Sequence, residues 1–121
     1  GYYAEKTISV TLSGVDGAEQ IKAIMAKFRN NAPKEWNTTA ITVVEDFKAQ
    51  TATAADGTVT NLTTPPSDVL KYTLADGSWI AVRPSGTEPK IKFYIAVVGE
   101  SNEDSQVKIA NIEAEINAFV K

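Results

Sequence analysis

Apolar and polar residues alternate in several stretches of the chain, a pattern that predicts β-strands with one buried face. The first such strand is predicted over residues 5–12, where Ile8, Val10 and Leu12 alternate with polar residues. Similar or shorter apolar runs predict further strands over residues 41–47, 69–74, 79–83 and 90–98. In the strand predicted over residues 90–98, successive side chains point to opposite faces, so four apolar side chains share one face: Ile91, Phe93, Ile95 and Val97.

Two other stretches have the three- and four-residue spacing of an amphipathic helix. The first helix is predicted over residues 16–30, and its apolar face consists of Ile21, Ile24, Met25 and Phe28. The second runs from about residue 102 to 119, with an apolar face of Ile109, Ile112, Ile116, Phe119 and Val120. Asp16 and Glu19, and likewise Ser101 and Asp104, have the spacing of N-terminal caps. Both apolar faces are therefore expected to be buried.

The segment 49–64 is rich in Thr, Ala, Asp and Gly and gives no clear pattern. Asp56-Gly57 marks a turn, so the segment is predicted as a weak hairpin or a long surface loop. Asp76-Gly77 lies directly between two predicted strands and is the best hairpin signal in the sequence. Strands joined mostly by hairpins, with two helices, predict an α+β fold. We expect a mainly antiparallel sheet of about four to six strands with both helices packed on one face.

The length of 121 residues predicts one domain, residues 1–121. The chain contains neither cysteine nor histidine, which excludes disulfides, cysteine nucleophiles and histidine metal ligands. Its net charge is −3, which argues against binding to nucleic acid or to a membrane surface through bulk electrostatics. No apolar run approaches the ~20 residues that span a bilayer, and no secretory signal pattern is visible. We therefore expect a cytoplasmic protein.

Folding requirements do not explain the segment 83–92, with the sequence Arg-Pro-Ser-Gly-Thr-Glu-Pro-Lys-Ile-Lys. Two prolines bracket Ser85, Gly86, Thr87 and Glu88, whose consecutive N–H groups could form an anion-binding loop. Gly86 permits a positive φ angle, and the hydroxyls of Ser85 and Thr87 add donors. Arg83 offers a planar fork that binds two phosphate oxygens. If the flanking strands pair, Arg83 is expected roughly opposite Lys90, with Lys92 on the same face.

Such an arrangement suits a phosphate monoester better than a carboxylate, because it offers more donors than a carboxylate accepts. Glu88 is then expected to point away from the anion or to pair with Lys90. The residues alone leave two other interpretations open. The segment could be an ordinary polar surface turn. Alternatively, Lys90 and Lys92 beside Phe93 and Tyr94 could form a platform for single-stranded nucleic acid, which an oligonucleotide titration would test.

Residues 83–94, Arg-Pro-Ser-Gly-Thr-Glu-Pro-Lys-Ile-Lys-Phe-Tyr, resemble the phosphate-binding loop of the α-D-phosphohexomutases, the phosphoglucomutases and phosphomannomutases. The hairpin around Asp76-Gly77-Ser78-Trp79 and the closing helix also resemble the C-terminal, fourth domain of that family. The resemblance is clearest from about Thr38 onward. The segment 31–36 is similar to the bacterial phosphoglucomutase branch, with less specific motifs.

The resemblance implies an enzyme that interconverts α-glucose 1-phosphate and glucose 6-phosphate through a bisphosphorylated sugar. In it, the fourth domain holds the phosphate that is not reacting. By this resemblance, the residues that bind the substrate phosphate in this chain are Arg83, Ser85, Gly86 and Thr87. Lys92 is added on weaker grounds, because only some members of the family have a basic residue at that position. The implied partners are a phosphosugar and the other three domains of the parent enzyme, with no nucleic acid and no membrane.

The catalytic phosphoserine and the Mg²⁺ of such an enzyme belong, by the same resemblance, to other domains. No cofactor is expected on this domain, and none of its residues is expected to be catalytic. Ser85 has no histidine to activate it as a nucleophile. The isolated chain is therefore expected to be inactive. Because the loop would grip only phosphate, a phosphomannomutase remains an alternative to a phosphoglucomutase.

Overall fold

The computed structural model describes all 121 residues. Its two helices are α1 (Gly17–Asn31) and α2 (Asn102–Phe119). Its eight strands are β1 (Tyr2–Thr11), β2 (Glu35–Trp36), β3 (Thr39–Asp46), β4 (Thr51–Ala54), β5 (Val59–Asn61), β6 (Leu70–Leu74), β7 (Trp79–Pro84) and β8 (Lys90–Gly99). The α+β class is confirmed, but the sheet has more strands than the four to six predicted.

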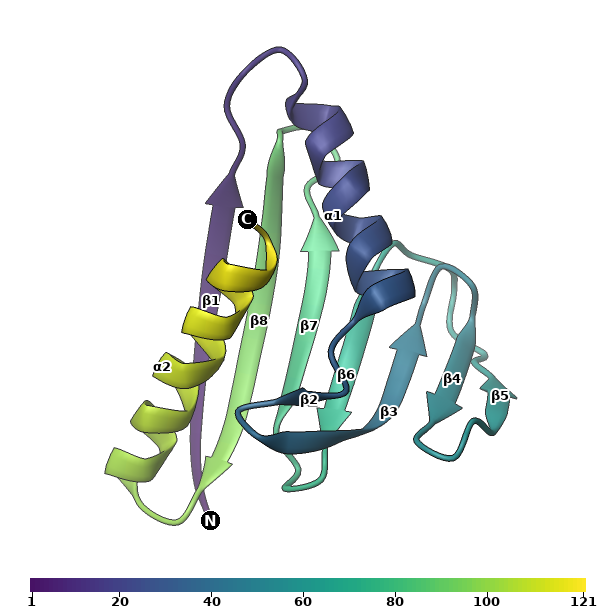
Figure 1. The fold of residues 1–121 in the computed structure, drawn as a ribbon. Helices are drawn as coiled ribbons and strands as arrows, with labels where there is room; N and C mark the ends of the chain where they lie inside the picture. The colour runs from purple at the N-terminus through teal and green to yellow at the C-terminus, as the bar shows by residue number, and fades with distance from the viewer.

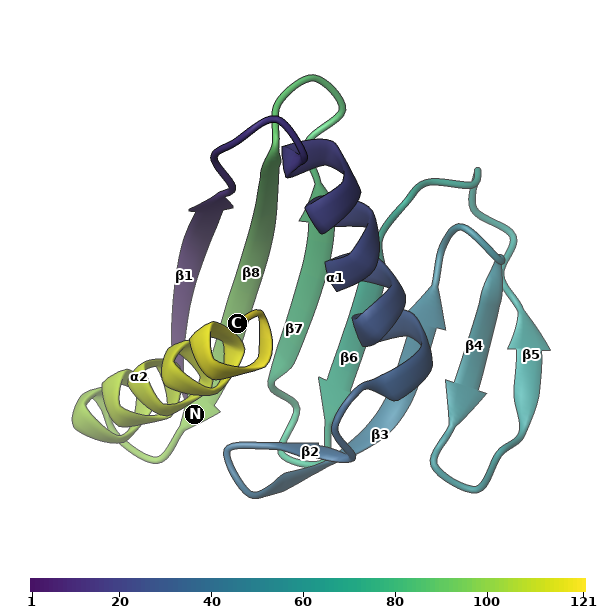
Figure 2. The ribbon, with the colours of Figure 1, turned by 45° about the horizontal axis from the view of Figure 1, so that its top comes forward.

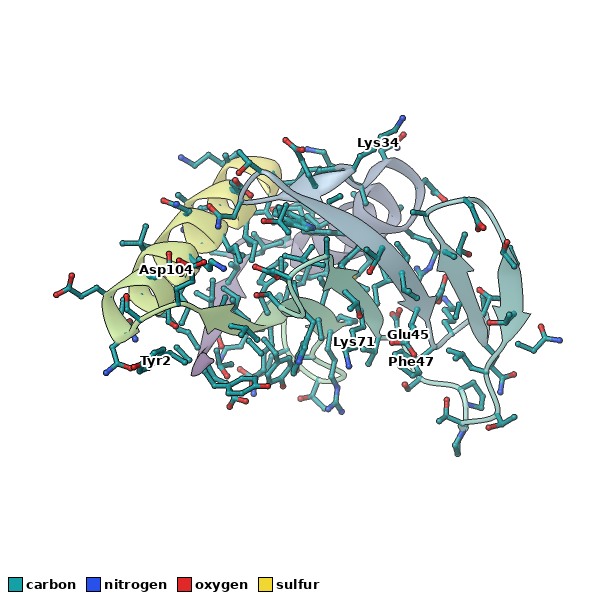
Figure 3. All side chains as sticks on the ribbon, turned by 90° about the horizontal axis from the view of Figure 1, so that it is seen from below. Tyr2, Lys34, Glu45, Phe47, Lys71 and Asp104 are labelled. Atoms are coloured by element: carbon teal, nitrogen blue, oxygen red, sulfur yellow. The ribbon has the colours of Figure 1, made fainter.

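Seven strands follow one another in the spatial order β1-β8-β7-β6-β3-β4-β5, all antiparallel, and β2 pairs with β3. Both helices lie on one face of this sheet, α2 over β1 and β8 and α1 over β7 and β6 (Figure 1). The opposite face carries no helix; Glu45 and Lys71 project from it in Figure 3. We call this opposite face the outer face. The prediction that both helices pack on one face is confirmed.

The additional strands come from segments with weak signals. Segment 49–64 forms the β4–β5 hairpin around Asp56-Gly57, so the weak-hairpin interpretation is confirmed and the long-loop one is wrong. The two-residue strand β2 was not predicted. Its turn to β3 uses Asn37 and Thr38 at φ angles of 50° and 55°, and threonine is a rare residue in that conformation.

The core lies between the helices and the inner face of the sheet. Of the helix residues predicted to be buried, six are: Ile21, Met25, Phe28, Ile109, Ile112 and Ile116. Ile24 and Phe119 are only partly buried and pack against the edge of this core. The Phe28 ring lies at its centre, in contact with the rings of Trp36, Tyr72, Phe93 and Phe119.

The two predicted helix caps have different outcomes. Ser101 caps α2, since its hydroxyl accepts a hydrogen bond from the Asp104 amide at 3.0 Å. Asp16 precedes α1 but makes no side-chain capping bond; its carboxylate accepts from the Gln20 side chain instead. The cap predicted at Asp16 is therefore wrong, because a side-chain partner one helical turn away takes the carboxylate that would have accepted the backbone N–H.

Asp46 at the end of β3 joins α1 to the sheet. Its carboxylate accepts from Arg29 Nε at 2.9 Å and from the amides of Lys48 and Ala49 at 3.1 Å. Burial acts to raise the pKa of Asp46, but these hydrogen bonds outweigh it and hold that pKa below its ordinary value.

This lowered pKa predicts a specific acid sensitivity. Because the folded pKa lies below the unfolded value of about 3.9, the ionised Asp46 stabilises the fold fully above about pH 5. That contribution is lost as the pH falls through the folded pKa. Asp46→Asn should lower the free energy of unfolding by about 1–3 kcal/mol at pH 7. Urea unfolding at pH 7 and pH 3 should show the gap between wild type and variant narrowing in acid; an equal gap at both pH values would contradict this.

Candidate phosphate site

The loop that joins β7 to β8 lies at the end of the sheet where β1 ends and α1 begins (Figure 2). Its base is a regular ladder. Arg83 pairs with Lys92 and Pro84 with Ile91, and the Ser85 amide donates to the Lys90 carbonyl at 2.9 Å. Four residues, 86–89, are left to turn the chain between the two strands.

The register differs from the sequence prediction. Arg83 lies opposite Lys92, and not opposite Lys90, because the ladder continues past Arg83 through Pro84. Directly paired residues of antiparallel strands share a face, so both cations project from the outer face. Neither forms an ion pair within the chain. The structure thus places Arg83 and Lys92 side by side on adjacent strands.

The third cation, Lys90, is paired with Glu88 at 3.4 Å. The prediction that Glu88 either turns away or pairs with Lys90 is thus confirmed in its second form. The predicted cluster of three available cations is wrong in number, because the Glu88 carboxylate partly neutralises Lys90. Both side chains are substantially exposed, so this ion pair is weak and solvent-screened.

The N–H groups of the loop are also less available than predicted. The Ser85 amide belongs to the ladder, and the amides of Thr87 and Glu88 point at the Ser85 hydroxyl, at 3.4 and 3.3 Å. Only the Gly86 amide has no partner in the chain. The two bonds to the Ser85 hydroxyl are long and therefore weak. A stronger acceptor, such as a phosphate oxygen, could replace the Ser85 hydroxyl as the partner of these two amides.

Gly86 does not adopt the positive φ that its residue type allows. A Cβ atom added there would meet no atom within 4 Å. The conformation of the loop therefore does not require glycine at this position. What the missing side chain provides is open space beside the backbone, which permits close approach by a ligand.

A small pocket of about 200 Å³ opens on the outer face beside the loop. Its lining consists of Arg83, Pro84, Ser85, Gly86, Lys92 and Tyr94. It thus brings together two cations, the hydroxyl-bearing side chains of Ser85 and Tyr94, and Gly86, with no carboxylate. Thr87 lies outside this lining, at the exposed tip. Tyr94 was named only in the nucleic-acid alternative and not among the phosphate-binding residues, although strand alternation places it on the same face as Lys92.

A larger concavity of about 730 Å³ lies on the other side of the loop, between the loop and α1. Its walls include Val15, Ile21 and Met25, and it contains Glu88 and Asp68. It includes neither Arg83 nor Lys92. The larger concavity also includes Lys22, Arg29 and Lys48 beside these carboxylates, and Arg29 is already paired with Asp46 and Asp68. The smaller pocket combines Arg83 and Lys92 with no carboxylate and is therefore the better match for an anion.

The far end of the loop is fixed to the start of α1. The Leu12 amide donates to the Pro89 carbonyl at 2.8 Å. Gly17 packs so closely on Pro89 that a Cβ at Gly17 would lie 2.8 Å from the Pro89 Cβ, well inside van der Waals contact. The first turn of α1 therefore helps to fix the loop that the sequence singled out.

Known protein sequences resemble this chain over most of its length. A sequence model of the family described as "Phosphoglucomutase/phosphomannomutase, C-terminal domain" matches residues 13–118. The chain belongs to this family. A phosphoglucomutase of Staphylococcus aureus strain bovine RF122 / ET3-1 is 37% identical over 110 residues, which are 90% of this chain and 20% of the relative. The phosphoglucomutases of strains USA300 and N315 are 37% and 34% identical over equal lengths.

This C-terminal domain thus spans about a fifth of the length of the curated relatives that it matches. Among solved structures, the solution structure of Chr148 from Cytophaga hutchinsonii has a TM-score of 0.42 and 16% identity. The matched region covers 95% of this chain and 87% of the Chr148 chain. At this level of similarity, the match supports no further statement about this chain. No helix of the domain is long and apolar enough to cross a membrane.

Proposed function

We propose that this domain holds the non-reacting phosphate of a sugar phosphate in a phosphoglucomutase. The observation that carries the proposal is the pairing of Arg83 with Lys92, two cations without an ion-pair partner, in the lining of a pocket that Gly86 also lines. Membership of the family and the phosphoglucomutase relatives support it.

Each residue has a distinct part in the proposed site. Arg83 binds two phosphate oxygens through its planar fork, and Lys92 adds a second positive charge opposite. The Ser85 hydroxyl donates a hydrogen bond to the phosphate. The amides of Thr87 and Glu88 give up their hydrogen bonds to the Ser85 oxygen and donate to a phosphate oxygen instead. The Thr87 hydroxyl approaches from the tip. The site supplies affinity and orientation, and no bond is made or broken in it.

In the proposed reaction, the parent enzyme interconverts α-glucose 1-phosphate and glucose 6-phosphate through a bisphosphate intermediate, and this loop holds either phosphate in turn. The other domains supply the phosphoserine and the Mg²⁺. The structure contains no group of three or more acidic side chains that could hold a metal ion. Glucose is proposed over mannose because the matched relatives are phosphoglucomutases. Cytoplasmic location stays a prediction.

An amide NMR titration of the 121-residue chain tests the proposal. Inorganic phosphate and glucose 6-phosphate should shift the amides of Ser85, Gly86, Thr87 and Glu88, with a dissociation constant near millimolar, or about 4 kcal/mol. Affinity is expected to be low because water competes at an open surface. Glucose without phosphate should leave these signals in place. The proposal is wrong if phosphate shifts no loop amide, or if an oligonucleotide at low salt binds the same residues more tightly.

A further inference from the structure

The larger concavity, which lies between α1 and the β7–β8 loop, follows the helix over most of its length, and we call it the α1 groove. Its α1 residues begin at Gly17 and end at Asn30, a length of about 20 Å at the rise of an α-helix. Val15 and Pro89 line the groove beside the loop, and Lys48 lines it after the end of β3. Figure 2 shows α1 running from the loop toward the end of β3. The groove therefore suits an elongated ligand.

The wall that α1 contributes is apolar. Ala18, Ile21 and Met25 have the spacing of one helix face, and all three line the groove. Ile21 and Met25 also belong to the core, where they are only 8% and 4% exposed, so this wall is held in place by packing. Val15 extends the apolar surface and is itself fully exposed. The volume of about 730 Å³ lies within the roughly 300–1,000 Å³ of pockets that bind small molecules.

The two carboxylates of the α1 groove are already paired within the chain. Asp68 accepts a hydrogen bond from Arg29 at 3.1 Å, and Glu88 forms an ion pair with Lys90 at 3.4 Å. A positively charged ligand would have to compete with these partners for either carboxylate. The groove therefore offers little to a cation.

The ammonium of Lys48 is, in contrast, available. Lys48 forms no ion pair within the chain. Its backbone amide donates to Asp46, which also accepts from Arg29, so Lys48 lies at the Arg29 end of the helix. The other lysine of the groove, Lys22, has Glu19 as a partner at 3.4 Å. The groove thus combines an apolar wall with one unpaired positive charge at the end away from the loop.

We propose that the α1 groove binds a small, elongated carboxylate with an apolar body. The body packs on Ile21 and Met25, and the carboxylate pairs with the Lys48 ammonium. Burial of apolar surface supplies most of the affinity, and the ion pair fixes the orientation. A single ammonium lacks the planar fork that favours phosphate, so the ligand class differs from that of the phosphate pocket. This inference does not rest on the proposed function.

The β7–β8 loop separates the α1 groove from the phosphate pocket, and residues 84–86 line both. A shift of these loop amides would therefore not distinguish the two sites. Ala18, Ala26 and Lys48 line the α1 groove and not the phosphate pocket. The amides of these three residues are the signals that report on the groove.

The test uses octanoate, octanol and octylamine, which share one alkyl chain and differ in charge, in amide NMR titrations of the 121-residue chain. Octanoate should shift the amides of Ala18, Ala26 and Lys48 with a dissociation constant near millimolar. It should bind about two- to fivefold more tightly than octanol, as an exposed ion pair allows, and octylamine should bind most weakly. Octanoate that shifts none of the three amides, or that binds no more tightly than octanol, would refute the proposal. Tighter binding of octylamine would refute it as well.

Lys48→Gln should remove the advantage of octanoate over octanol and leave the affinity for octanol unchanged. The matched control is Lys34→Gln, which removes another exposed lysine that does not line the groove and should retain the advantage. If Lys48→Gln also retains it, the carboxylate does not pair with Lys48 and the proposed orientation is wrong.

Ala26→Glu and Ala23→Glu test the position of the alkyl chain. Both alanines are exposed on α1, but only Ala26 lines the groove, and glutamate suits a helix at either position. Ala26→Glu should weaken octanoate binding severalfold, because the new side chain occupies the groove and repels the carboxylate, whereas Ala23→Glu should behave like wild type. Equal octanoate affinities for the two variants would place the ligand outside the groove and overturn the inference.

Discussion

Phe28→Ala is expected to lower the free energy of unfolding by about 3–5 kcal/mol, the usual cost of removing a fully buried aromatic ring. Phe28 is 1% exposed, and its ring centroid lies 4.6 Å from that of Phe119 and 5.6 Å from that of Phe93. Four rings surround the site and hold one another in place, so the cavity cannot collapse easily. The loss corresponds to a melting temperature lower by about 10–20 °C, measurable by calorimetry or urea unfolding.

Ile24→Ala provides the control for this prediction. Ile24 lies on the same helix one turn earlier and is only partly buried, so its truncation should cost about 1–2 kcal/mol. A Phe28→Ala variant as stable as the Ile24→Ala variant would contradict the packing of α1 described above. Hydrogen exchange that leaves the α1 amides unprotected in wild type would contradict it as well.

In the proposed parent phosphoglucomutase, Arg83→Lys is expected to reduce kcat/KM by an amount equivalent to about 1–3 kcal/mol, roughly 5- to 150-fold. The substitution keeps the positive charge at the position opposite Lys92 but loses the planar fork that binds two oxygens at once. Steady-state kinetics measure the effect. Thr87→Val should cost less, because it removes a single neutral donor at the exposed tip.

Lys90→Ala is the matched control for charge at this end of the sheet. Lys90 is paired with Glu88 and does not line the pocket, so its removal should change kcat/KM little. If Arg83→Lys behaves like wild type while Lys92→Ala is strongly impaired, bare charge explains binding. The central role given to the Arg83 fork would then be wrong.

The elements that the sequence predicts well are those with one buried face. Helix α1 and strand β8 have long periodic patterns, and their bounds agree with prediction to within one or two residues. Strands β4 and β5 consist mainly of Thr, Ala and Asn with no fully buried face, so no alternation marks them. Strand β2 has only two residues, too few for a period, and its turn residues are not those that usually mark a hairpin.

At the candidate site, the sequence identifies the residues but not their pairing. The sequence of segment 83–92 does not indicate where the hydrogen-bonded pairing of β7 with β8 ends. Because this pairing continues to Ser85, the partner of Arg83 is Lys92 and not Lys90. The same continuation uses the Ser85 amide. The pairing of β1 with β8 places Thr7 opposite Tyr94 and Ser9 opposite Lys92, more than 80 residues away in sequence, a long-range contact that no local pattern contains.

The contact of Pro89 with Leu12 and Gly17 gives the loop two supports of different kinds. Its first half continues the rigid β7–β8 ladder, while its second half is attached to the first turn of a helix. The height of the loop above the sheet is therefore set by how deeply α1 sits in the core. A change that lifts or tilts α1, even one buried at Met25, is therefore expected to move Pro89 and with it the second half of the loop.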